Sequence, residues 1–114
     1  MIDTARVLYD GTIGTQRVRV WLEPRGGGMG LFSHDMGSSL EPVFGKSEIE
    51  TFLEVDAQRM RTMAAHLRAE RPASANALTA IELLSEKYQH NAATTSDFRA
   101  WLSEHGIPYR FMIV

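Results

Sequence analysis

The fold is decided by residues 48–56, Glu-Ile-Glu-Thr-Phe-Leu-Glu-Val-Asp, in which the side chains alternate in character along the chain. A period of two is typical of a β-strand with one buried face and one solvated face. One face carries Ile49, Thr51, Leu53 and Val55, and the other carries Glu48, Glu50, Phe52 and Glu54. Asp56 then predicts the start of a helix, because its side chain can accept hydrogen bonds from the free N–H groups of a first helical turn.

Strand patterns also fill the chain before this stretch. Residues 5–9, 16–23 and 29–34 are rich in strand-forming side chains, and turns that contain glycine separate them. Within residues 16–23 the apolar side chains alternate with arginines and with Trp21, which places Trp21 on the outer face. These three segments predict an antiparallel meander.

Helical patterns occupy most of the remaining chain. We expect a short helical turn at 38–44, a helix from Asp56 to Pro72, a helix of about four turns after residues 71–74, and a helix from near Thr95 to Gly106. The expected apolar stripes are Met60, Met63, Ala64 and Leu67, then Leu78, Ile81, Leu84 and Tyr88, then Phe98, Trp101 and Leu102. Thr94 and Asp97 resemble a capping box, and Gly106 predicts a Schellman ending in which Ile107 folds back on Leu102. Residues 107–114 alternate as a final strand.

Together these elements predict an α+β fold in a single domain, residues 1–114. The expected sheet is antiparallel and has four to five strands: the N-terminal meander, one middle strand and the C-terminal strand. About three helices pack with it, and the strands form either one meander or two smaller sheets. A chain of 114 residues that is 44% hydrophobic and 23% charged has the size and composition to bury one core.

Composition also bears on the cellular compartment. Cysteine is absent, which excludes a disulfide framework, a thiolate metal site and a cysteine nucleophile. The first residues carry an acid at position 3 and no long apolar run, so they do not have the pattern of a signal peptide. No stretch approaches the length of a membrane span. We therefore expect a cytoplasmic protein with no membrane partner.

Charge is unevenly distributed along the chain. The formal net charge is −2, but residues 1–56 carry −4 and residues 57–114 carry +2. Within residues 35–56, six acids face a single base, Lys46. Asp56 is assigned to a helix cap and Glu41 to a turn. The remaining candidates for contact with a partner are Asp35, Glu48, Glu50 and Glu54.

Motifs for catalysis or cofactor binding are missing. Ser33-His34-Asp35 has the residue types of a catalytic triad, but neighbours on a strand point to alternate faces. The four histidines lack zinc-ligand spacing, and the glycines between 26 and 30 precede a strand instead of a helix. We expect no catalytic residues, no metal and no cofactor.

Several short motifs carry a family resemblance. They are Leu31-Phe32-Ser33-His34-Asp35-Met36-Gly37, Val43-Phe44-Gly45, Ile49-Glu50, Leu53-Glu54-Val55-Asp56 and Trp101-Leu102-Ser103-Glu104-His105-Gly106-Ile107-Pro108-Tyr109. They resemble a family of small bacterial proteins that are similar in size and build to immunity proteins of polymorphic-toxin and contact-dependent inhibition systems. The resemblance implies a protein that neutralises a toxin by binding it directly.

Three hypotheses on function follow. The first is an immunity-type binder that contacts a basic toxin domain through the four acidic candidates, since acidic patches select basic partners and speed association. The second is an interaction or scaffold domain that self-associates through Trp21 and Phe52. The third is a small enzyme or a nucleic-acid binder. Arg17 and Arg19 beside Trp21 could bind a single-stranded nucleic acid by charge and base stacking. The sequence pI near 6.1 opposes this, because binding of phosphates needs a surplus of positive charge.

Overall fold

The computed structural model describes residues 5–71 and 78–114. The elements are β1 (Arg6–Ile13), β2 (Gln16–Arg25), β3 (Gly28–Met36), the 3-10 turn η1 (Ser38–Leu40), α1 (Glu41–Phe44), β4 (Glu48–Val55), α2 (Ala57–Ala69), α3 (Ala80–Tyr88), α4 (Thr94–Glu104) and β5 (Arg110–Ile113). The α+β fold is confirmed. The five strands form one sheet in the order β1-β2-β3-β4-β5, with every neighbouring pair antiparallel.

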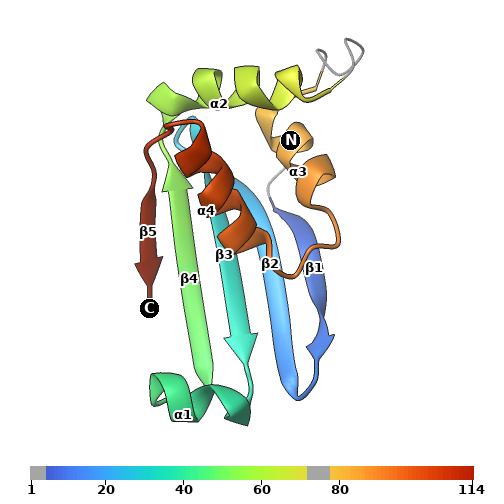
Figure 1. The fold of residues 1–114 in the computed structure, drawn as a ribbon, viewed down its shortest axis with the longest axis vertical. Helices are drawn as coiled ribbons and strands as arrows, with labels where there is room; N and C mark the ends of the chain where they lie inside the picture. Colours follow the sequence, from blue (N-terminus) through green and yellow to red (C-terminus); the bar gives the residue numbers. More distant parts are fainter. Residues whose placement is uncertain (1–4, 72–77) are drawn as a thin grey trace.

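Helix α4 lies over one face of this sheet, α2 crosses the end of the sheet at which β4 ends, with α3 beside it, and α1 lies at the opposite end (Figure 1). One buried cluster joins the sheet to these helices. Its largest members with almost no exposed surface are Leu8, Leu22, Met29, Leu31 and Leu53 from strands, and Met63, Leu67, Leu83, Leu84, Phe98 and Leu102 from helices. The described residues therefore form two layers, and none of their helices packs on the second face of the sheet.

The expected alternation in β4 is confirmed. Ile49, Leu53 and Val55 are buried on the helix side, while the glutamates lie on the opposite face. Asp56 caps α2, because its carboxylate accepts a hydrogen bond from the Arg59 backbone N–H at 3.2 Å. The strand and the helix are thus joined by one residue, as the sequence indicates.

Of the two expected caps of α4, the C-terminal one is confirmed and the N-terminal one is wrong. Gly106 has a φ of 65°, and the Ile107 N–H donates to the Leu102 carbonyl at 2.9 Å, which is the expected Schellman geometry. The expected capping box at the start of α4 is wrong, because Thr94 is the first helical residue and its hydroxyl donates to a preceding carbonyl. The capping box lies instead at α3, between Thr79 and Glu82.

Two differences concern the remaining elements. The final strand is shorter than expected and begins at Arg110, after Pro108, whose ring nitrogen has no N–H to donate to a sheet. The expected helix end at Pro72 and the start of the following helix lie outside the described residues. No helix within residues 5–71 and 78–114 is long and apolar enough to cross a membrane.

Candidate functional site

The uncovered face of the sheet carries an apolar row that crosses all five strands. The strand register pairs its members in the order Val7, Trp21, Phe32, Phe52 and Met112. The rings of Trp21 and Phe32 stack with centroids 5.3 Å apart, and those of Phe32 and Phe52 lie 4.8 Å apart. The end residues Val7 and Met112 are 48% and 46% exposed. We call this set the open-face row.

The position of the row follows from local structure. In β2, β3 and β4 each row residue has a buried core residue beside it on its strand, Leu22, Leu31 and Leu53, so the row residue points to the other face. At β1 a bulge between Val7 and Tyr9 places the intervening Leu8 in the core, and the Leu8 carbonyl accepts from the His90 N–H at 2.7 Å. Val7 therefore stays on the outer face opposite Trp21.

Charged residues border the open-face row on the side toward α1. The next row of the sheet pairs Arg19, His34 and Glu50, and the row after it pairs Arg17, Met36 and Glu48. These rows put positive charge on β2 and negative charge on β4, with β3 between them. The carboxylates remain open to solvent, since the side chains of Glu48 and Glu50 are 63% and 61% exposed.

Several contacts already involve these charged groups. The guanidinium of Arg17 pairs with Asp10 at 2.8 Å, and the His34 Nε2 atom lies 2.8 Å from Glu48 and 3.9 Å from Glu50. Pairs this exposed contribute little to stability, because water and salt screen them. They leave the charges available to a second molecule.

Glu54 differs from the other two glutamates of its face. Its carboxylate pairs with Arg110 at 2.7 Å and lies 3.9 Å from Arg25. Arg25 in turn lies over the rings of Phe52 and Phe32, at 5.0 Å and 5.9 Å from their centroids. Glu54 is therefore neutralised within the molecule and fixes an arginine over the aromatic rings.

Asp35 is separated from the three glutamates. It pairs in register with Val18 and Ile49, which puts it on the helix side of the sheet. Burial raises the pKa of its carboxyl, an effect that nearby His34 partly opposes, and Gln16 Nε2 donates to it at 3.2 Å. The three glutamates share a face as the sequence predicts, but Asp35 does not join them.

A polar hollow surrounds Asp35 between the sheet and the start of α4. Ser33, Thr51, Thr95 and Arg99 line it with Asp35, among other residues. The Ser33 and Thr51 hydroxyls hydrogen-bond to each other, and His34 lies on the opposite face of the sheet. His34 therefore points away from Ser33 and Asp35, as the alternation along a strand predicts, whereas Ser33 and Asp35 share the helix side of the sheet.

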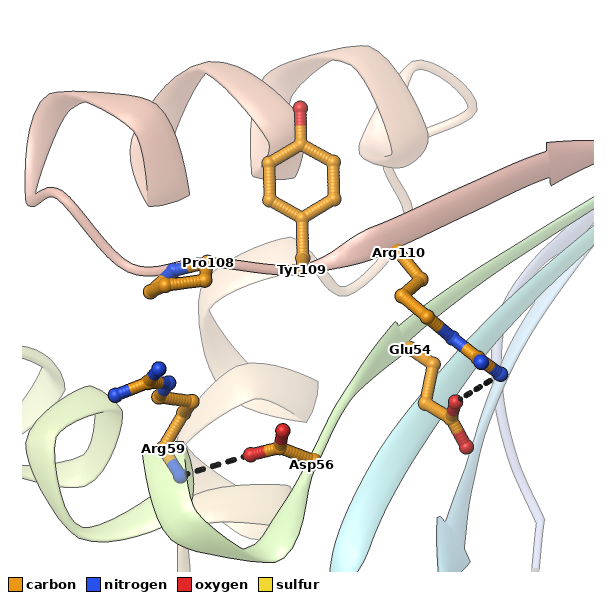
Figure 2. A pocket seen from close by; sticks show the side chains of 6 residues that line it. All are labelled: Glu54, Asp56, Arg59, Pro108, Tyr109 and Arg110. Atoms are coloured by element: carbon orange, nitrogen blue, oxygen red, sulfur yellow. Dashed lines mark hydrogen bonds and ion pairs between the residues drawn. The ribbon is translucent and has the colours of Figure 1, made fainter.

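A second cleft lies where α2 begins and β5 approaches the sheet (Figure 2). Its carboxylates are already engaged, since Asp56 caps α2 and Glu54 binds Arg110. The Tyr109 side chain points away from the cleft, and its hydroxyl accepts a hydrogen bond from Arg99 Nε at 3.2 Å. Both carboxylates of this cleft are thus bound by partners within the chain, and Arg59 is the other charged residue of α2 that lines it. Among residues 5–71 and 78–114, no group of three or more histidine or acidic side chains could hold a metal ion.

Sequence reasoning found Trp21 and Phe52 but missed the residues that join them. Phe32 has the same alternation as its neighbours in residues 29–34, so its outward position could have been read from the pattern. No such signal exists for Val7, Met112 and Arg25, because their positions depend on a bulge, a strand pairing and a side-chain contact.

Comparison of the chain with protein-family models, curated proteins and solved structures gave no match.

Proposed function

We propose that this protein is a non-enzymatic binding protein that holds a protein partner against the open face of its sheet. The observation that carries the proposal is the open-face row, five apolar side chains in register on which no helix of residues 5–71 and 78–114 packs. Aromatic side chains and arginine are enriched in the centres of protein interfaces, and charged residues form the rims. Here aromatic rings form the centre, and Arg19 and Glu50 belong to the rim.

The immunity-type hypothesis specifies the class of partner. Glu48 and Glu50 support a partner with a basic surface, since their carboxylates are exposed beside the row. We exclude Asp35 and Glu54 from the proposed contacts with the toxin. Asp35 faces the helix layer, and Glu54 is already bound by arginines of the same chain. The partner would be a toxin domain, and the absence of cysteine suits action in the cytoplasm.

The direct test is co-expression with the toxin domain that this proposal requires to be encoded beside the protein. We expect the wild type to restore growth and to form a complex. The variant Trp21→Ala/Phe52→Ala should bind the toxin at least ~10-fold more weakly, because it truncates the centre of the interface. Phe44→Ala is the matched control, since Phe44 is a 48% exposed aromatic side chain of α1, away from the row.

Circular dichroism would show first that the double variant is folded. A folded Trp21→Ala/Phe52→Ala variant that protects as well as the wild type would refute the assignment of the binding surface. A chain that neither binds nor protects against the adjacent toxin domain would refute the immunity function.

The open-face row also gives the nucleic-acid hypothesis a specific form. Arg19 lies 5.4 Å from the Trp21 ring centroid, and exposed aromatic rings can stack on bases. The glutamates at 23, 48, 50 and 54 flank the same row and would repel phosphates. We expect no binding of labelled single-stranded RNA or DNA in fluorescence anisotropy at low salt. Binding that weakens as salt rises would favour the nucleic-acid function instead.

A further inference from the structure

We infer that a second copy of this chain docks on the open face, forming a two-fold dimer whose axis runs parallel to β3 between the two sheets. The inference rests on the proposed role of this face as a binding surface and names a partner for it. The inference is based on the charges of the open face, which are positive on β2 and negative on β4, with β3 between them. A two-fold interface must be complementary to itself, and this pattern meets that condition.

The strand register shows how the charges would meet. Arg19 and Glu50 both pair with His34, so they lie at the same height on opposite sides of β3. A rotation by 180° about an axis along β3 exchanges the two sides and keeps the height. It therefore places Arg19 of each copy over Glu50 of the other. Arg17 and Glu48 meet in the same way, since both pair with Met36.

The same rotation matches the apolar groups. Trp21 and Phe52 both pair with Phe32, so Trp21 of one copy lies over Phe52 of the other, and Phe32 faces its own counterpart. Val7 and Met112 end the row and meet each other. Sheets that pack face to face keep their strands within about 30° of alignment at a separation of about 10 Å, which suits a layer of aromatic side chains.

Other arrangements are less favourable. An axis across the strands through the open-face row would put β2 on β2 and β4 on β4. It would oppose Arg17 to Arg25 and Glu50 to Glu54 of the second copy. In the proposed arrangement like charges meet in the row of Gly30, where Glu23 of each copy lies over Glu54 of the other. Glu54 is neutralised there by Arg110 and Arg25.

The size of the face predicts a weak dimer. At the usual strand rise and spacing, the face between the Glu48 and Glu54 rows covers roughly 500 Å² per copy. Two copies would bury roughly 1,000 Å², the lower limit for a specific interface, so we expect a Kd in the micromolar range.

The test exchanges charges between the two partners. Sedimentation equilibrium of the full chain from about 1 µM to 1 mM should show a monomer–dimer equilibrium. Arg19→Glu alone and Glu50→Arg alone should each weaken the dimer by ~10-fold or more, because each opposes like charges twice. A mixture of these two variants should restore one favourable Arg–Glu pair of swapped sense and keep one native pair, and so restore dimerisation. Arg61→Glu, an exposed position of α2 on the helix side, is the control and should have no effect.

A wild type that stays monomeric across this range would overturn the inference. So would a dimer that both single variants leave intact, or a mixture of the variants that fails to associate. The proposed function is judged separately. If the chain is monomeric but Trp21→Ala/Phe52→Ala abolishes protection against the toxin, the face belongs to the toxin alone. If the dimer forms but that variant protects fully, the toxin binds elsewhere.

Discussion

Gly28, the first residue of β3, is the position where a single methyl group should do the most damage. The variant Gly28→Ala would place its Cβ atom 2.2 Å from the Val55 carbonyl oxygen and 2.9 Å from the Asp56 carbonyl carbon. Both neighbours are backbone atoms at the junction of β4 and α2, so no side chain can rotate to make room. Either the β3 end or this junction must move.

The cost can be estimated from that geometry. Overpacking a buried site costs about 1–3 kcal/mol, and a backbone obstacle puts this site near 3 kcal/mol. The smaller conformational freedom of alanine in the unfolded chain returns about 0.5–1 kcal/mol. We expect a net loss of about 2–2.5 kcal/mol in the free energy of unfolding, equal to a fall of about 10 °C in Tm for a chain of this length.

Gly14→Ala is the matched control. Gly14 has a φ of 62°, and a Cβ atom there would meet no atom within 4 Å. Its cost is the left-handed backbone alone, about 1 kcal/mol. Backbone angles alone would predict that Gly14→Ala is the more destabilising variant, because Gly14 has a positive φ and Gly28 does not lie in that region. Urea unfolding followed by tryptophan fluorescence would compare the two midpoints at an unchanged slope. A loss below about 0.5 kcal/mol for Gly28→Ala would refute the argument.

Three further predictions concern single side chains. Phe32→Ala should lower the free energy of unfolding by about 2 kcal/mol in urea titrations, because Phe32 is partly buried and contacts two rings of the open-face row. Glu70→Gln should cost about 1 kcal/mol at neutral pH after allowing for solvent screening. Burial raises the pKa of the Glu70 carboxyl, but hydrogen bonds from Lys87 and Trp101 outweigh it and lower the pKa overall, so the difference from wild type in thermal melts should shrink as the pH falls through that lowered pKa. Asp35→Asn should stabilise the protein at neutral pH, because burial raises the pKa of Asp35 and disfavours its charged form in the folded state. That gain should shrink in melts as the pH falls through the raised pKa, and it should vanish well below the ordinary aspartate pKa of about 3.9, where the carboxyl is protonated in both states.

Local rules explain why much of the fold could be predicted. The alternation in residues 48–55 depends only on which side chains favour water, and it gave both faces of β4 correctly. Asp56 and Gly106 act within a few residues of their own positions, so the start of α2 and the end of α4 could be read directly. Thr94 misled because a threonine three residues before an acid has the composition of a capping box whether or not its backbone is at the cap.

The sequence by itself determined the α+β class, the outward faces of Trp21 and Phe52, and the shared face of three glutamates. Only the tertiary structure decided that Phe32 joins the two rings into one row, that Arg110 and Arg25 neutralise Glu54, and that Asp35 faces the helices. The physical reason is the distance along the chain over which each interaction acts. A side chain's face follows from the period of its own strand, whereas its neighbours follow from the register between strands, which is fixed by the packing of the whole core.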